Sequence, residues 1–329
     1  MTLRYLLNSG KNSKLKYYAM CYLRYAMPRS IYQHSLDKML QRFNNLSSEE
    51  QQYIEKRVNY YCKLDPTKIT HLEPNATTLG EHKLQNKKGY HSPYFFDTYE
   101  YTRYFDDYLK WSHLFGDITH SPPTPMIVKS RPIGDNNENS VVMKLNKNRH
   151  FIYVNDSIKF EDKSNSAIFR GDIMGKDDRR GFITRFIDHP MCDIGVVSHN
   201  SGYPAEWRRK AMSIYEHLTH KFVFALEGND VASNLKWVMS SNSLAIMPRP
   251  TCETWFMEGT LKGGEHFVEI ERDFSNLESQ MQYYIDHPKE AKEISNNANR
   301  YVDQFKDSDR ETLISLLVLV SYFERTGQL

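Results

Sequence analysis

The spacing of apolar positions divides this chain of 329 residues into two parts. In the first part, apolar side chains recur every three or four residues, as on one face of a helix, for example at Leu15, Tyr18 and Tyr22. This spacing predicts helices between residues 13 and 63, interrupted at the first proline, and a further aromatic-rich helix over Asp97–Leu114.

After Pro125 the pattern changes, and short apolar runs alternate with helical stretches. Strands are predicted over Met126–Lys129, Phe151–Val154, Ala167–Arg170, Asp193–Ser198, Lys221–Leu226, Leu244–Met247 and His266–Ile270. The helices predicted between these strands cover Arg179–Asp188, Ala205–Thr219, Asp230–Ser240 and the short segment Glu253–Glu258. An alternating β-α-β-α order is typical of an α/β protein with a parallel, doubly wound sheet.

Composition adds limits on partners and location. Hydrophobic residues make up 40% of the chain, enough for a folded core, and the net charge of +2 gives no reason to expect nucleic acid as a partner. The four cysteines form no Cys-x-x-Cys pair, so neither a disulfide framework nor a zinc site is expected. No apolar run is long enough for a secretory signal or a membrane span. The sequence therefore predicts a cytoplasmic protein that could touch a membrane surface.

Three loops of the second part carry the candidate chemistry, because ligands of open parallel sheets bind outside the carboxyl ends of the strands. The first loop follows the strand that ends at Arg170 and Gly171, and it contains Gly175, Lys176, Arg179 and Arg180. Glycine lets the backbone approach a ligand closely, and arginine grips phosphate through paired hydrogen bonds. This loop is either a cradle for a diphosphate or a solvated charged turn.

The other two loops add polar groups at the same predicted edge. The second loop places polar side chains and a glycine at a helix start: Glu227, Gly228, Asn229, Asp230, Ser233, Asn234 and Lys236. The third carries Glu253, whose carboxylate could accept bonds from both hydroxyls of a ribose or simply face a helix N-terminus. Together the loops favour a nucleotide diphosphate. The chain lacks the glycine fingerprints of dinucleotide-binding enzymes and of P-loop phosphotransferases, so those classes are disfavoured.

Five segments carry a resemblance to a known family: FRGDIMGKDDRRGF, HPMCDIG, HKFVFALEGNDVASNLKWVMSSNSLAIMP, ETWFMEG and HFVEIERDFSNL. They resemble the core motifs of the family 90 glycosyltransferases, which include protein O-glucosyltransferases, capsule xylosyltransferases and lipopolysaccharide-modifying proteins. The likeness extends over roughly Met126 to Phe305. It is closest to the bacterial lipopolysaccharide branch, where VKSRPI and NENS also recur.

The resemblance implies a fold and a reaction. It implies an α/β, GT-B-like architecture with two Rossmann-like domains and a helical N-terminal region. The corresponding domains would be an acceptor-side domain over 1–165, a donor domain over 166–305, and a C-terminal helix over 306–329 that packs back on the first domain. It further implies an inverting, metal-independent enzyme that needs no cofactor. The donor would be a UDP-sugar and the acceptor a lipopolysaccharide core or another surface glycan.

The resemblance also assigns residues to the donor site. Arg170 and Gly171 fall on the family's Phe/Trp-Arg-Gly motif, and Arg179 falls on the arginine that faces the diphosphate. Gly228 and Lys236 fall on the Gly and Lys of the family's G-x-x-x-S-x-R-x-K run. In that run Ala232 stands in place of the usual Ser, with Ser233 beside it, and Asn234 stands in place of the usual Arg.

The catalytic base is expected in a loop of the N-terminal domain. Pro132 lies where the family's aspartate might fall, so the prediction is Asp135, with Glu138 and Asp172 as alternatives. The plainer interpretation of Asp135 is a Gly-Asp-Asn turn. The one Asp-x-Asp triplet, at Asp307, precedes a helix and is expected to cap it rather than to bind a metal ion. Arginine and lysine side chains and helix N-termini would then stabilise the negative charge of the leaving diphosphate.

Two other classes of function remain open on the sequence. The changes at Ala232 and Asn234 would suit a nucleotide-sugar-binding or scaffold protein whose catalysis is impaired. The aromatic, basic helix near Lys16–Arg29 would suit a membrane-surface adaptor, although such a face more often packs against another helix.

Overall fold

The computed structural model describes residues 9–85, 92–173, 177–197 and 202–329. The chain forms two compact units. Unit 1 contains residues 9–12, Arg149–Pro250 and Gly259–Gln304, and unit 2 contains Ser13–Asn148, Thr251–Glu258 and Phe305–Leu329. The domain limits drawn from the sequence stay a prediction.

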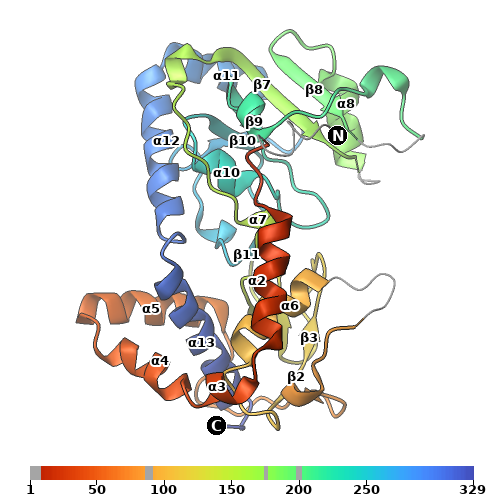
Figure 1. Ribbon diagram of the computed structural model, residues 1–329. Helices are drawn as coiled ribbons and strands as arrows, with labels where there is room; N and C mark the ends of the chain where they lie inside the picture. Colours follow the sequence, from red (N-terminus) through yellow and green to blue (C-terminus); the bar gives the residue numbers. More distant parts are fainter. Residues whose placement is uncertain (1–8, 86–91, 174–176, 198–201) are drawn as a thin grey trace. The chain divides into compact units, whose positions relative to one another are not determined.

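Unit 1 is built on one five-stranded sheet in which every neighbouring pair of strands is parallel (Figure 1). Its strands are β7 (Ser164–Gly171), β8 (Cys192–Val196), β9 (His220–Phe224), β10 (Leu244–Met247) and β12 (Val268–Glu269). The order across the sheet is β12-β10-β9-β7-β8, so β7 lies inside the sheet and β8, which follows it in the chain, lies at the edge. A mixed α/β chain with a parallel sheet is thereby confirmed. The predicted strand Phe151–Val154 is wrong, since that segment forms no ladder.

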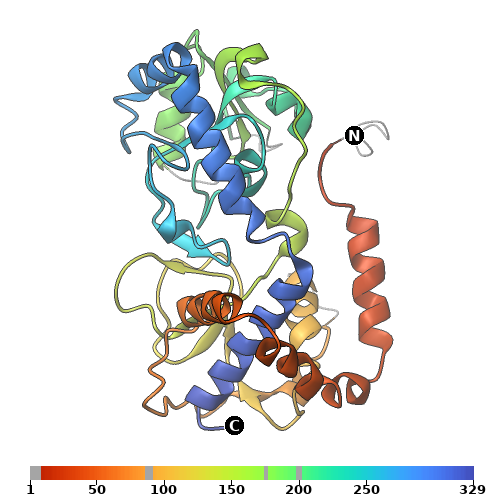
Figure 2. The same ribbon diagram turned by 90° about the vertical axis from the view of Figure 1, so that its left-hand side faces the viewer.

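The helices of unit 1 are α8 (Asp177–Phe186), α9 (Ile214–His217), α10 (Leu235–Met239), α11 (Leu277–Asp286) and α12 (Pro288–Asp303). α12 packs beside β10 (Figure 2). Phe169, Phe182 and Phe274 meet in the buried core between α8 and the sheet. α9 is shorter than predicted because a capping box starts it late: Ser213 accepts a hydrogen bond from the backbone N–H of Glu216, whose carboxylate accepts one from the N–H of Ser213.

Unit 2 contains most of the helices that the first part of the sequence predicts. They are α2 (Lys14–Ala26), α3 (Arg29–Gln33), α4 (Leu36–Asn44), α5 (Ser48–Tyr61) and α6 (Ser92–Thr102), joined by the last helix, α13 (Ser308–Arg325); the short α7 (Lys147–His150) lies where the chain passes to unit 1. Asp307 caps α13 by accepting hydrogen bonds from two backbone N–H groups, which confirms its predicted capping role. α6 ends at Thr102, well before the predicted Leu114, because the chain then enters two short strands.

Three small sheets complete unit 2. β3 (His113–Leu114), β4 (Met126–Val128) and β6 (Ser140–Val142) form a parallel sheet in the order β3-β4-β6. β1 (Thr77–Thr78) pairs with β2 (Lys110–Trp111), and β5 (Ser130–Pro132) pairs with β11 (Cys252–Thr254); both pairs are antiparallel. The predicted helix Glu253–Glu258 is therefore wrong: Glu253 lies in a strand, directly opposite Arg131, and a short 3-10 helix begins only at Glu258.

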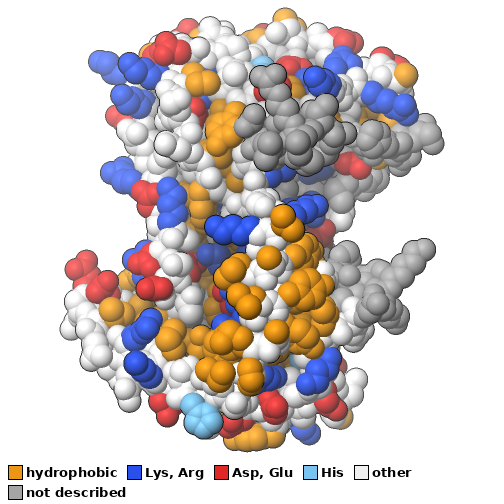
Figure 3. All heavy atoms as spheres, viewed as in Figure 1, with side chains coloured by type: hydrophobic (Ala, Val, Ile, Leu, Met, Phe, Trp, Pro, Cys, Tyr) orange, Lys and Arg blue, Asp and Glu red, His pale blue; other side chains and the backbone are white. Residues whose placement is uncertain are grey.

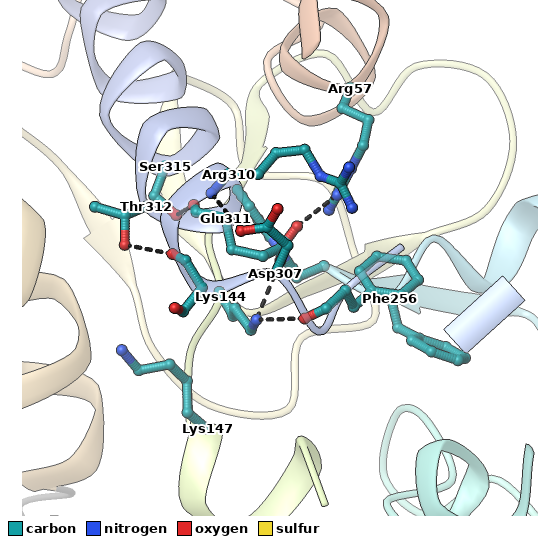
Figure 4. Close-up of polar contacts among 12 residues, drawn as sticks. Arg57, Lys144, Lys147, Phe256, Asp307, Arg310, Glu311, Thr312 and Ser315 are labelled. Carbon is teal, nitrogen blue, oxygen red and sulfur yellow. Dashed lines mark hydrogen bonds and ion pairs between the residues drawn. The ribbon is translucent and has the colours of Figure 1, made fainter. Parts of the chain in front are cut away.

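A buried carboxylate, that of Glu311 on α13, joins four segments of unit 2 (Figure 4). It accepts hydrogen bonds from Arg57 Nη1 on α5 at 2.5 Å, from Lys144 Nζ after β6 at 3.0 Å and from Trp255 Nε1 after β11 at 2.6 Å. The Trp255 ring in turn stacks on Tyr61 of α5, with 3.8 Å between the ring centroids. Two cations and a ring N–H thus satisfy one charge that is almost wholly removed from water.

We expect Glu311→Ala to lower the free energy of unfolding by about 3–5 kcal/mol, because it leaves buried cations without their counter-charge. Urea unfolding of the purified protein measures this loss. Glu324→Ala is the matched control, since Glu324 lies on the same helix with an exposed side chain and should change stability by less than about 0.5 kcal/mol. Equal losses in the two variants would contradict the role given to Glu311.

Candidate functional site

The strand order of unit 1 has a switch point between β7 and β9. From β7 the chain passes to β8 on one side, whereas β9, β10 and β12 follow on the other side. Ligands of such sheets bind in the crevice outside the carboxyl ends of the strands at this point. Because the strands are parallel, the loops after β7, β9 and β10 leave the sheet at the same edge, as the sequence predicts.

Arg179, in the first turn of α8, joins the two loops at the switch point. Its Nη1 donates to the carbonyl oxygen of Asp172 at 2.6 Å, after β7. Its Nη2 and Nε donate to the carbonyl oxygens of Leu226 at 2.8 Å and Glu227 at 2.9 Å, after β9. These bonds take three of the five N–H groups of the guanidinium. Arg179 therefore fixes the shape of the crevice as well as its charge.

A small pocket opens beside Arg179 at this edge of the sheet. It is lined by Arg179 of α8 and by residues of the loops after β9, β10 and β12, namely Ala225, Leu226, Glu227, Pro248, Arg272 and Phe274. Phe274 has a backbone φ of +61°, which costs a non-glycine residue on the order of 1–3 kcal/mol and is typical of functional sites. Pro248, Arg272 and Phe274 were not among the site residues predicted from the sequence. Arg272 and Phe274 lie in HFVEIERDFSNL, one of the segments that carry the family resemblance, and this was the available signal.

Several cations surround this pocket. Burial lowers the pKa of Arg179; the carboxylate of Asp172 opposes this change and the charge of Arg149 adds to it. Arg149, on α7, is exposed and also escaped the sequence prediction, since KLNKNRH matches no binding motif. Arg272 holds the loop after β10 by donating to the carbonyl oxygen of Arg249 at 2.7 Å. Two guanidinium groups line the pocket and the charge of a third, Arg149, acts on Arg179, so the site has affinity for an anion.

Arg170 and Gly171 lie at the end of β7, but the Arg170 side chain turns toward β8. Its Nη2 forms an ion pair with Asp193 Oδ1 at 2.6 Å, and its Nη1 donates to the Asp193 carbonyl oxygen at 2.8 Å. A Cβ atom on Gly171 would lie 2.5 Å from the Phe169 ring, so glycine is needed there for the ring to pack. The predicted contacts of Arg170 and Gly171 with a diphosphate stay predictions. Gly175 and Lys176 of the same loop are outside the described residues.

The second predicted loop forms the turn from β9 into α10. Glu227, Gly228, Asn229 and Ser233 are half-buried there. The Asn234 side chain donates to the carbonyl oxygen of Phe224 at 2.8 Å and so ties the turn to the end of β9. Lys236 is wholly buried, with its Nζ 6.0 Å from the Phe151 ring centroid. In this structure Glu227 lines the pocket, while Asn234 and Lys236 stabilise the turn behind it.

Two predicted site residues, Glu253 and Asp135, belong to unit 2. Glu253 is buried, and it accepts hydrogen bonds from Arg131 Nε at 2.8 Å and from the Tyr60 hydroxyl. Asp135 is exposed in the turn between β5 and β6, where Gly134 and Asn136 have positive φ angles. Their predicted roles, toward a ribose and as a catalytic base, stay predictions.

Two further findings concern metals and membranes. In the described part of the chain, no three His, Cys, Asp or Glu side chains come together as a metal site would require. Across the same residues, no helix combines the length and the hydropathy needed to span a bilayer.

Comparison with known proteins gives two matches. The model of glycosyl transferase family 90 matches residues 140–322, a range that includes Arg149, Arg179 and Arg272. The chain is also 36% identical over 311 residues to the O-glucosyltransferase LpsA of Dichelobacter nodosus. That alignment covers 94% of this chain and 95% of the relative.

Proposed function

Because the chain belongs to glycosyl transferase family 90, and is therefore a glycosyltransferase, we propose that it transfers glucose or a related sugar from a UDP-sugar. The donor binds at the carboxyl edge of the unit 1 sheet, in an architecture of the GT-B type. Glucose is favoured because the relative is an O-glucosyltransferase. The enzyme needs neither a metal ion nor another cofactor in this proposal.

The pocket beside Arg179, at the carboxyl edge of the sheet, is the observation that carries the proposal. A diphosphate bears negative charge, and Arg179, Arg272 and Arg149 supply positive charge at this edge. Two N–H groups of Arg179 are not used in its bonds to the loops and can donate to phosphate oxygens. The first turn of α8 adds backbone N–H groups, which favour an anion. When the bond between sugar and diphosphate breaks, the same groups stabilise the charge that develops on the leaving group.

The transfer inverts the anomeric centre in a single displacement. A carboxylate takes the proton of the acceptor hydroxyl, the hydroxyl oxygen forms a bond to C1 of the sugar, and the bond from C1 to the diphosphate breaks with its electron pair leaving on UDP. We assign the base to Asp135, whose exposed position leaves its carboxylate open to an incoming acceptor. Glu138 and Asp172 are the alternatives, and the Asp172 carboxylate accepts a hydrogen bond from the Tyr203 hydroxyl at 3.0 Å.

The acceptor in this proposal is a lipopolysaccharide core or a related surface glycan, and the reaction takes place in the cytoplasm. The name of the relative supports this class. A second candidate is a nucleotide-sugar-binding protein with impaired catalysis. It is favoured by Asn234, which stands where the family has an arginine and uses its amide to hold the β9 turn. Binding of UDP without transfer of any sugar would establish that alternative.

Arg149→Ala and Arg179→Ala should each weaken UDP binding by about ten- to hundredfold, because each removes a charge-assisted hydrogen bond worth about 1.5–3 kcal/mol. Isothermal titration calorimetry measures the dissociation constants. Arg300→Ala serves as the control, since Arg300 is exposed on α12 of the same unit and should leave the affinity unchanged. Unchanged affinity in both test variants would remove the donor site from this edge of the sheet.

Asp135→Asn should lower kcat by about 10²- to 10⁴-fold and leave the UDP dissociation constant unchanged, because a general base acts on the acceptor and not on the nucleotide. Steady-state kinetics with the purified enzyme give kcat, and Glu138→Gln is the neighbouring control. Full activity in Asp135→Asn, with the loss found in Glu138→Gln or Asp172→Asn, would move the base to that residue.

Lipopolysaccharide from cells that lack the gene should gain the mass of one hexose when it is incubated with the enzyme, UDP-glucose and EDTA. Mass spectrometry detects the gain, and NMR of the product should show the anomeric configuration opposite to that of the donor. An unchanged mass would exclude this acceptor class. A gain that requires added Mn²⁺ or Mg²⁺ would contradict metal independence.

A further inference from the structure

The beginning of the chain has an unusual charge distribution. Its first 36 residues contain six Lys or Arg and no Asp or Glu, although the whole chain has a net charge of only +2. Three exposed lysines, Lys11, Lys14 and Lys16, precede or open α2. Cations at a helix N-terminus oppose the helix dipole, so this placement slightly destabilises α2. A favourable interaction of these lysines with something outside the chain would offset that cost.

The same segment exposes most of the large apolar side chains at the surface. Among the described residues, eleven such side chains are exposed, and six of them lie between residues 15 and 31. These six form the apolar face of α2 and α3: Leu15, Met20, Tyr22, Leu23, Met27 and Ile31. Figure 3 shows hydrophobic side chains gathered over α2, with basic side chains near its ends. A contiguous apolar surface of this kind marks an interaction site.

The opposite side of α2 is already packed, so the apolar face is not a core surface that lacks its neighbour within unit 2. Cys21 and Tyr25 pack against Phe95, Phe96 and Tyr99 of α6. The helix is further held by two polar contacts: Tyr17 Oη donates to Asp97 Oδ1 at 2.7 Å, and Arg24 pairs with Glu100 at 2.7 Å. α2 is thus fixed with its apolar face directed outward, except that Tyr22 at the edge of this face also contacts the Phe96 ring, with 5.0 Å between the ring centroids.

From these observations we propose that the apolar face of α2 and α3 docks on an anionic phospholipid bilayer. An amphipathic helix with basic residues beside an exposed Leu, Met and Tyr surface binds in the plane of a membrane interface. The lysines at its start would meet the lipid phosphates, and Leu15 and Leu23 would enter the acyl boundary. Such docking would bring the enzyme to the membrane on which a lipid-linked acceptor resides. That consequence rests on the proposed function, but the docking itself does not depend on it.

Charge distinguishes a bilayer from a second copy of this chain. If two copies met through this face, the basic segment of one, with Lys11, Lys14 and Lys16 and no Asp or Glu among residues 1–36, would approach the equally basic segment of the other, and like charges repel. An anionic bilayer attracts all three. The observations therefore favour lipid over self-association.

Flotation of the full-length protein with vesicles tests the proposal without any sugar donor. The wild-type protein should float with vesicles of phosphatidylcholine and phosphatidylglycerol at low salt and bind vesicles of pure phosphatidylcholine much less. It should be released at about half-molar salt, because the Debye length then falls to a few ångströms. Leu23→Glu should lower the partition coefficient about tenfold or more, because the variant lacks the apolar side chain that the bilayer would bury. Lys14→Gln with Lys16→Gln should lower it roughly 30-fold, or about fivefold for each lysine.

Matched controls isolate the face. Leu329→Glu replaces a leucine that is 60% exposed, as Leu23 is 61% exposed, and Lys289→Gln with Lys292→Gln removes two exposed lysines from α12. Both controls should bind vesicles as the wild type does, and calorimetry with UDP should show equal affinity in every variant, which separates this test from that of the donor site. No flotation of the wild type, or equal losses in Leu23→Glu and Leu329→Glu, would overturn the proposal. So would a wild-type dimer in analytical ultracentrifugation that Leu23→Glu dissociates.

Discussion

The guanidinium of Arg179 is the constraint on which the candidate site depends. It sits where the strand order reverses, and its three hydrogen bonds hold the loop after β7 to the loop after β9. Backbone carbonyl oxygens at these strand ends would otherwise need water or another donor. Because the Arg179 guanidinium donates a hydrogen bond to each of these carbonyl oxygens, the same side chain both shapes the crevice and gives it positive charge. Arg272 acts in a similar way on the loop after β10, so two cations define the pocket from opposite loops.

Unit 2 depends on buried charge in a different manner. Glu253 pairs with Arg131 in the register of β5 and β11, and Glu311 pairs with Arg57 and Lys144 beside the Trp255 ring. Two of the segments that carry the family resemblance, VKSRPI and ETWFMEG, meet in this strand pair. One ion pair inside unit 2, between Arg131 and Glu253, joins the two segments. A shared motif can therefore preserve a buried ion pair as well as a contact with substrate.

The sequence predicted the sheet of unit 1 well because its strands are continuous apolar runs separated by helices, and burial on both faces requires that pattern. It predicted that Arg179 lies at the sheet edge for the same reason. Short elements escaped: the chain around Lys110–Trp111 and Cys252–Thr254 forms strands of two or three residues, which periodicity cannot detect. Arg149 and Arg272 were not singled out as site residues because their relation to Arg179 arises from long-range packing: the charge of Arg149 acts on Arg179, and Arg272 lines the same pocket.

A crystal structure of the protein with UDP-glucose would show where the donor diphosphate binds. We expect density for the diphosphate outside the carboxyl ends of β7 and β9, with a phosphate oxygen about 3 Å from the guanidinium of Arg179. Nucleotide density away from this edge, with the Arg179 guanidinium making no contact to phosphate, would contradict this expectation.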